Sequence, residues 1–328
     1  MEIGKQLLYL SAQEVEACGL IMRECIELME DAYRAKSDGY TEMPAKPRLG
    51  DPSKGWFLEA FLANIRDEKP GGKWLGGCFE NAERNIPAIT GLIILNDYAT
   101  CCPIAVMDCA YITGMRTAAV SGMALRALQN PEAKVLSILG CGLQGRTHLE
   151  AVLSIPNSIE RVLAWGPRMS TAQRYIEEMQ KKYDVQFTAV SDVKEAVCAA
   201  DVLISSTPFG DPELFTVIDG DWFKAGVTVA CISGANHFSP EAFYAFDKYY
   251  MDDPAAYAQI AEKKGFEACA SVRPAEIGDV LTNKALGRAH PQEKILFNSI
   301  GIGINDMAAA YAIYERALKL DLGTVLPL

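Results

Sequence analysis

Short apolar runs alternate with amphipathic segments along the second half of the chain, from Lys134 onward. The apolar runs have the length of strands and fall at 135–139, 161–165, 185–190, 202–206, 227–232 and 249–251. Strands buried on both faces consist of such runs, and helices connect them when they are parallel, so the pattern predicts βαβ units. We therefore expect an α/β domain with a doubly wound parallel sheet.

The two ends of the chain have a different pattern. Helical periodicity extends over 11–39 and 113–128. Between these segments, strand-like runs broken by turn residues lie at 56–65, 73–79 and 91–95. The last stretch, 296–318, is again helical and rich in alanine. We expect it to pack on the N-terminal segment, so that both ends form one discontinuous α+β domain.

Composition and charge exclude several functional classes. The 328 residues carry a formal net charge of −11, which repels nucleic acid and acidic membrane surfaces. No apolar run reaches the roughly 18 residues of a membrane span, and the N-terminus lacks the features of a signal peptide. The ten cysteines stand in apolar segments and the three histidines are too few for a zinc cluster, so we expect reduced thiols and no metal site. These features predict a cytoplasmic protein without nucleic-acid or membrane partners.

A glycine-rich turn follows the first apolar run of the α/β half. Gly140, Gly142 and Gly145 form the pattern GxGxxG ahead of an amphipathic segment. In this context the first glycine makes the tight turn, the second lets the backbone approach a pyrophosphate, and the third lets helix and strand pack closely. We therefore expect a dinucleotide here, with Leu143 and Gln144 of the same turn among its contacts.

The second strand of this half indicates which dinucleotide binds. Its end should lie beside the adenosine ribose, and no carboxylate stands there to accept a hydrogen bond from the 2′-hydroxyl. Arg168, Ser170 and Thr171 occupy this segment instead, and they suit a 2′-phosphate. We expect NADP(H) in preference to NAD(H). The alternative is that Arg168 is a solvated loop charge.

A polar loop that contains Thr207 follows the fourth strand. Cofactors lie at the carboxyl ends of parallel strands, so Thr207 is a candidate contact on the nicotinamide side. A turn stiffened by Pro208 explains the same residues equally well.

Three cations of the first third lie in apolar or turn contexts: Arg48, Lys73 and Arg116. A guanidinium group suits bidentate binding of a carboxylate. A lysine whose pKa is lowered by burial can transfer a proton or polarise an imine nitrogen. Surface charges and internal ion pairs are the alternatives for all three.

Four segments of the chain, taken in order, resemble the ornithine cyclodeaminase/mu-crystallin family. They are Ile86–Asp97, Met115–Ala119, Gly140–Gly145 and Leu296–Asp306. The resemblance implies a Rossmann domain inserted into a substrate-binding and dimerisation domain, and a homodimer. The boundaries that we expect are 129–298 for the Rossmann dinucleotide-binding domain and 1–128 plus 299–328 for the substrate-binding domain.

The resemblance also implies roles for the three cations. In the family, two arginines and a lysine bind the substrate carboxylate and the reacting centre, and Arg48, Lys73 and Arg116 stand at the matching positions. Lys46 takes the place of Arg48 if the loop is shifted. Thr117, next to Arg116 in the same motif, is a further candidate contact with the cofactor.

The chain departs from the family after the fifth strand. Ornithine cyclodeaminases carry an aspartate there, whereas this chain has Asn236, and an amide cannot act as a general base near neutral pH. The neighbouring His237 suits proton transfer to an amine, or else it is a loop residue in water. The departure favours a reductase or dehydrogenase over a lyase, with Lys73, His237 and Asn236 as the catalytic set.

These features predict an NAD(P)H-dependent oxidoreductase that acts on a small amino or imino acid, by imine reduction or amino-acid dehydrogenation. Arg48 and Arg116 would hold the substrate carboxylate, and Lys73 with His237 would supply the proton for the nitrogen. Two alternatives stay open: a lyase of the ornithine cyclodeaminase type that releases ammonia, and a non-catalytic binder of NADPH and a small ligand, of the mu-crystallin type.

Overall fold

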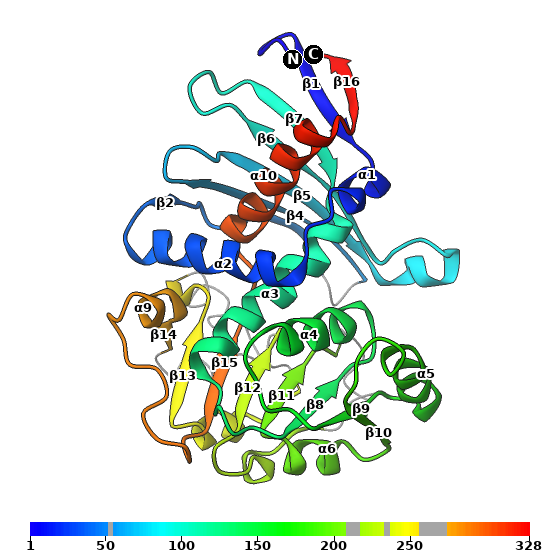
Figure 1. Cartoon of the computed structure of the whole chain (residues 1–328), viewed down its shortest axis with the longest axis vertical. Helices are drawn as coiled ribbons and strands as arrows, with labels where there is room; N and C mark the ends of the chain where they lie inside the picture. The colour runs from blue at the N-terminus through cyan, green and yellow to red at the C-terminus, as the bar shows by residue number, and fades with distance from the viewer. Residues whose placement is uncertain (52–54, 208–216, 233–236, 256–273) are drawn as a thin grey trace. The chain divides into compact units, whose positions relative to one another are not determined.

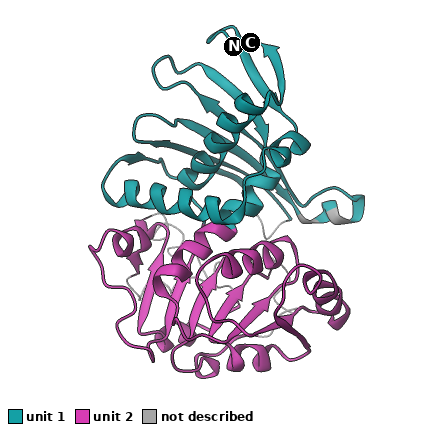
Figure 2. Cartoon of the chain, in the orientation of Figure 1, with its two compact units in different colours: residues 1–117, 301–328 teal, residues 118–300 magenta. Residues whose placement is uncertain are grey.

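A computed structural model of the chain describes residues 1–51, 55–207, 217–232, 237–255 and 274–328. The chain forms two compact units (Figure 2). Unit 1 contains residues 1–117 and 301–328, and unit 2 contains residues 118–300. The division falls inside helix α3 (Ala110–Leu128), ahead of the boundary at residue 128 expected from the sequence.

Unit 1 contains an eight-stranded sheet with the strand order β16-β1-β7-β6-β5-β4-β2, in which β3 also pairs with β4 (Figure 1). Neighbouring strands are antiparallel, except that β1 and β7 are parallel. Their bounds are β1 Gln6–Leu10, β2 Thr41–Glu42, β3 Arg48–Asp51, β4 Trp56–Ile65, β5 Gly71–Cys78, β6 Ile89–Asn96, β7 Pro103–Asp108 and β16 Thr324–Pro327.

Helix α10 (Gly303–Leu320) covers one face of this sheet, because it packs on β4, β5 and β6. It also contacts α2 (Met22–Ser37) and α1 (Ala12–Ala17). Side chains alternate between the two faces of each strand, so in β5 Lys73 and Leu75 are buried while Trp74 is exposed. The opposite face, which we call the outer sheet face, exposes large apolar side chains along β4, β5 and β6, namely Trp56, Leu62, Trp74, Leu92 and Ile94.

Unit 2 contains a parallel sheet with the strand order β10-β9-β8-β11-β12-β15-β13-β14 (Figure 1). The chain runs outward from β8 to β10, returns at β11 and continues the other way, which confirms the doubly wound fold. The strand bounds are β8 Val135–Leu139, β9 Arg161–Trp165, β10 Gln186–Val190, β11 Val202–Ser205, β12 Thr228–Cys231, β13 Lys248–Met251, β14 Ala275–Glu276 and β15 Ile295–Asn298. The helices of this unit include α4 (Leu143–Ser154), α5 (Met169–Met179), α6 (Val193–Ala199) and α9 (Ile277–Leu281).

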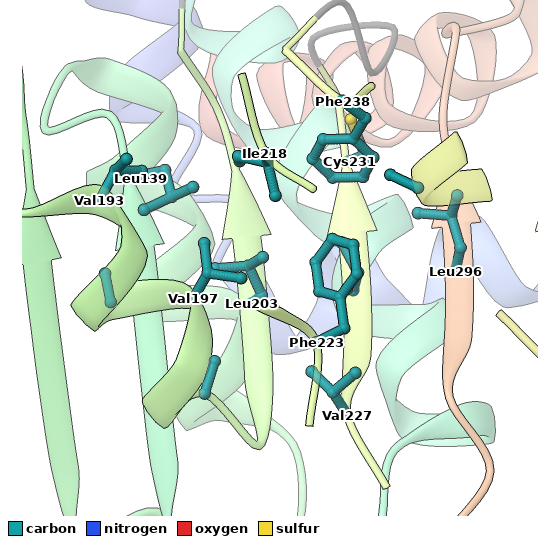
Figure 3. Close-up of a cluster of buried hydrophobic side chains, with 14 of the residues drawn as sticks. Leu139, Val193, Val197, Leu203, Ile218, Phe223, Val227, Cys231, Phe238 and Leu296 are labelled. Carbon is teal, nitrogen blue, oxygen red and sulfur yellow. The ribbon is translucent and has the colours of Figure 1, made fainter. Parts of the chain in front are cut away.

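A core of buried apolar side chains covers one face of the unit 2 sheet (Figure 3). Leu203 and Cys231 extend from neighbouring strands, and Val197 of α6 lies beside Leu203. Phe223 and Phe238 complete the cluster with their ring centroids 5.5 Å apart in an edge-to-face arrangement. Burial on both faces explains why these strands are apolar throughout rather than alternating.

The prediction of a helix over 296–318 is wrong for its first residues. Ile295–Asn298 forms β15, a fully buried strand between β12 and β13, and α10 starts only at Gly303. A four-residue apolar run has no periodicity that separates a buried strand from a buried helix. The sequence also did not predict β1, β7 and β16. No helix within the described ranges is long and apolar enough to cross a membrane.

Candidate functional site

The three glycines of the turn after β8 have different surroundings. Gly140 has a φ of +105°, and a Cβ on Gly145 would lie 2.1 Å from the carbonyl oxygen of Gly140. Both positions therefore require glycine for the turn itself. At Gly142, by contrast, no atom of the described residues lies within 4 Å of the place that a Cβ would take. The protein backbone is thus open to a ligand at Gly142.

Gly142 is also the N-cap residue of α4, and no described side chain caps this helix end. The first N–H groups of a helix have no partner within it and carry a partial positive charge, so they suit a pyrophosphate. Leu143 is exposed, whereas the side-chain oxygen of Gln144 is buried without a hydrogen-bond partner in the described part of the chain. These residues fit a dinucleotide.

Arg146, which the sequence analysis overlooked, fixes the carbonyl side of this turn. Its Nη1 donates to the carbonyl oxygens of Cys141 and Gly142, the latter at 3.1 Å. Its Nε and Nη2 donate to Glu178 of α5 at 2.9 and 2.6 Å, and Arg146 holds the pKa of this carboxyl below its usual range. The glycine turn is therefore tied to α5.

The predicted ribose segment lies at the neighbouring strand end, since β9 pairs with β8. Arg168 is the N-cap residue of α5 and is exposed, as is Ser170, while Thr171 is half-buried. The three side chains thus start one helix, next to the strand that leads into the glycine turn.

Thr207 and His237 line the same small cavity of unit 2, together with Trp165 and Ser205. The Thr207 hydroxyl is buried and has no hydrogen-bond partner among the described residues. The backbone carbonyl of His237 accepts from the amide of Ile218 at 2.7 Å. The cavity therefore offers a hydroxyl and an imidazole at the carboxyl end of the sheet. Asn236 lies outside the described residues.

In unit 1, Lys73 is a completely buried cation on the inner face of β5. Its Nζ donates to Asp306 Oδ1 at 2.7 Å and lies 4.4 Å from the centroid of the Phe61 ring. The pKa of Lys73 is lowered to about 8, because burial and the nearby Arg116 charge lower it more than the Asp306 carboxylate raises it. Lys73 can therefore exchange a proton at mildly alkaline pH.

Arg116 of α3 shares the same carboxylate. Its Nε lies 3.1 Å from Asp306 Oδ1, but the N–H group is not aligned for a hydrogen bond, so we treat the contact as an ion pair. Its Nη1 would be 2.7 Å from a Cβ at Gly301, so the guanidinium fits only beside a glycine. The Thr117 hydroxyl donates to the carbonyl of Thr113 at 2.7 Å, which leaves its lone pairs for a ligand.

Arg48 and Lys46 contact different side chains of β4. Arg48 pairs with Glu59, with Nε 2.7 Å from Oε1, and stands over the Phe57 ring. Lys46 donates to the carbonyl of Gly301 at 3.0 Å, and its Nζ lies 5.0 Å from the Phe61 ring centroid. Lys46 therefore shares an aromatic ring with Lys73, whereas Arg48 stands beside Glu59.

Asp306 joins Lys73 to Arg116, and the sequence analysis did not select it. It stands in the first turn of α10 beside Asn305, and both side chains are completely buried. Two consecutive polar residues in an alanine-rich helix were the available signal, because polar groups are rarely buried without a role.

Comparison with protein families and known proteins adds independent information. A model of the Ornithine cyclodeaminase/mu-crystallin family matches residues 6–321. N-((2S)-2-amino-2-carboxyethyl)-L-glutamate dehydrogenase of Staphylococcus aureus is 32% identical over 343 residues, which cover 99% of this chain and 100% of the relative.

Two solved structures are similar over almost their whole length. One is Δ1-pyrroline-2-carboxylate reductase of Thermococcus litoralis in complex with NADH and L-proline, with a TM-score of 0.88 and 26% identity, covering 97% of this chain and 99% of that one. The other is an archaeal alanine dehydrogenase dimer with bound NAD. It has a TM-score of 0.88 and 28% identity, and the match covers 98% of this chain and 99% of that one.

Proposed function

The chain belongs to the ornithine cyclodeaminase/mu-crystallin family, and we propose that it is an NAD(P)-dependent oxidoreductase acting on the carbon–nitrogen bond of a small amino or imino acid. The relatives named above are reductases and dehydrogenases of such acids, which supports this class. The observation that carries the proposal is Lys73, a completely buried lysine whose pKa of about 8 suits proton exchange with an amine.

In this proposal the residues of unit 1 bind and protonate the substrate. Arg116, with Arg48 or Lys46, holds the carboxylate, because guanidinium and ammonium groups form charge-assisted hydrogen bonds with it. Lys73 donates a proton to the nitrogen during reduction and accepts one during oxidation. When bound, the nicotinamide supplies or accepts the hydride. His237 is a second candidate proton donor, and Asn236 stays a candidate on sequence grounds.

The cofactor belongs to the Rossmann domain, which we place at 129–298, with the substrate-binding and dimerisation domain at 1–128 plus 299–328. Its proposed contacts follow three neighbouring strands: the glycine turn with Leu143 and Gln144 after β8, the segment of Arg168, Ser170 and Thr171 after β9, and Thr207 after β11. Thr117 stays a candidate contact on sequence grounds. We propose NADP(H) in preference to NAD(H), on the basis of Arg168. A cytoplasmic location stays part of the proposal.

The decisive experiment follows the absorbance of reduced nicotinamide with NADPH and with NADH. The substrates are 2-oxo acids with ammonia or methylamine, and cyclic imino acids such as Δ1-pyrroline-2-carboxylate. Consumption of the reduced nucleotide by an imino acid is the expected result. Release of ammonia from ornithine or lysine without net change in the nucleotide would instead identify a cyclodeaminase, and binding without any turnover would identify a binder.

Replacing Arg168 with alanine should weaken the binding of NADPH and leave the binding of NADH unchanged. A charge-assisted hydrogen bond to the 2′-phosphate contributes about 1.5–3 kcal/mol, so the dissociation constant for NADPH should rise by about 10- to 100-fold. Fluorescence titration with both nucleotides measures this. Arg161→Ala, which removes an exposed arginine at the start of β9, the strand that precedes Arg168, is the control. An equal change for both nucleotides would remove Arg168 from the selection of the cofactor.

We further propose that two copies of the chain associate through the outer sheet face. Exposed apolar side chains on one face are typical of an interface, and on this face Leu62, Trp74 and Ile94 line one groove. The archaeal alanine dehydrogenase is described as a dimer, which supports this choice of partner.

Trp74→Glu should convert a dimer into a monomer, because it places a charge among the apolar side chains of the outer sheet face. Light scattering coupled to size-exclusion chromatography measures the mass. Leu286→Glu, which alters a more exposed leucine of unit 2, should leave the dimer intact. If the Trp74→Glu protein keeps the mass of the wild type, the outer sheet face is not the interface.

A further inference from the structure

Asp306 is a buried carboxylate whose two oxygens have different surroundings. Oδ1 accepts from Lys73 Nζ at 2.7 Å and lies 3.1 Å from Arg116 Nε. Oδ2 is equally buried, and no residue in the described part of the chain donates a hydrogen bond to it. A buried acceptor without a donor is costly, and a charged one more so, which indicates that a donor arrives from outside the protein.

The geometry of Arg116 argues against a purely neutralising role for this carboxylate. A guanidinium that only balances a carboxylate tends to engage both of its oxygens through two parallel N–H groups. Here Nε alone approaches Oδ1, while the Nη1 edge is turned toward Gly301. Asp306 therefore keeps one oxygen available.

We propose that Asp306 Oδ2 receives the N–H group of the substrate nitrogen, which makes Asp306 a catalytic residue beside Lys73. The inference rests on the oxidoreductase function proposed above. In an amino or imino acid the nitrogen and the carboxylate are attached to the same carbon, so the group that binds the nitrogen must lie next to the group that binds the carboxylate. Asp306 meets this requirement through its contact with Arg116.

The charges balance along the reaction. In the reductive direction the substrate enters as an iminium cation, and the Asp306 carboxylate stabilises its positive charge. Hydride from the reduced nicotinamide forms a C–H bond, and the electron pair of the C=N bond moves to the nitrogen. The resulting amine takes a proton from the Lys73 ammonium group, and Asp306 stays ionised throughout. The oxidative direction reverses each step.

The test compares ligands that differ only at the nitrogen. L-Proline is paired with tetrahydrofuran-2-carboxylate, and L-alanine with L-lactate, and all are titrated into the protein loaded with NADP⁺. The wild type should bind each amino acid more tightly than its oxygen analogue. Asp306→Asn keeps an oxygen for Lys73 but loses the charge. It should therefore lower the affinity for the amino acids by about 10- to 100-fold and change the affinity for the oxygen analogues less than twofold.

Two results would overturn the inference. One is that the wild type binds the amino acids no more tightly than the oxygen analogues. This comparison uses the wild-type protein alone, so it does not depend on the folding of a variant. The other is an Asp306→Asn protein that loses both kinds of ligand equally, since a carboxylate that only neutralises Lys73 and Arg116 would act on both. Asp31→Asn, which removes the exposed partner of Arg66, controls for loss of an ion-paired aspartate in the same unit.

The imine reduction assay separates this inference from the proposed function. If the wild type reduces imines and Asp306→Asn does so at the same rate, the role of Asp306 is refuted while the oxidoreductase stands. If the wild type reduces no imine with either nucleotide, the oxidoreductase itself fails, whatever the variant does.

Discussion

Replacing Lys73 with methionine should reduce kcat for imine reduction by about 100- to 10,000-fold, the usual contribution of a positioned general acid. Methionine has a similar length and no charge, and it can keep the contact with the Phe61 ring. The affinity for the dinucleotide should stay unchanged, because Lys73 is not among the proposed contacts of the cofactor. Steady-state kinetics at saturating nucleotide, with a separate nucleotide titration, measure both quantities.

Lys319→Met, which alters an exposed lysine of α10, is the matched control and should keep wild-type kinetics. Wild-type turnover in the Lys73→Met protein would remove this lysine from the mechanism. In that case His237 would become the leading candidate for the proton donor.

The same lysine sets the pH dependence, with opposite signs in the two directions. Burial lowers the pKa of Lys73 from its usual 10.5 to about 8, so the ammonium form dominates below this pH and the neutral amine above it. Imine reduction needs the ammonium form, and kcat should fall as the pH rises through about 8. Amino-acid oxidation needs the neutral amine, and kcat should rise over the same range. A midpoint near the usual lysine value would show that Lys73 does not control the rate.

The sequence predicted the architecture of unit 2 better than that of unit 1, for a physical reason. A parallel sheet buried on both faces leaves apolar runs between helices, and six of its eight strands follow from these runs within one residue at either end. The sequence pattern predicts a helix where β15 lies, because the position of β15 between β12 and β13 depends on a return of the chain that no local pattern encodes. In unit 1, β1 and β16 pair across almost the full length of the chain.

Some residues of the candidate site could be predicted from the sequence, and others depend on the tertiary packing. Lys73 and Arg116 stood out as cations in apolar contexts, and the structure brings them together on one carboxylate. Asp306 did not stand out, because it lies 233 residues from Lys73 and only the packing of α10 on β5 joins them. Arg48 is beside Glu59 rather than beside Lys73, a distinction that depends on which strand neighbour each side chain meets.

Gly142→Ala should weaken dinucleotide binding by about 10- to 100-fold, which corresponds to the 1–3 kcal/mol typical of a side chain forced into occupied space. The free protein has room for this methyl group, since none of its described atoms lies within 4 Å of it. The thermal unfolding temperature without cofactor should therefore equal that of the wild type. The whole effect should appear as a rise in the dissociation constant, because the methyl group stands where the pyrophosphate approaches the backbone.

Gly145→Ala provides the contrast, because its Cβ would lie 2.1 Å from the carbonyl oxygen of Gly140. This variant should lower the unfolding temperature even without cofactor, since helix α4 must move away from β8. Calorimetric melting and fluorescence titration of both variants separate a glycine required by the fold from a glycine required by the ligand. If Gly142→Ala binds NADPH and NADH as tightly as the wild type, the pyrophosphate does not lie against this turn, and the proposed cofactor site must be placed elsewhere in unit 2.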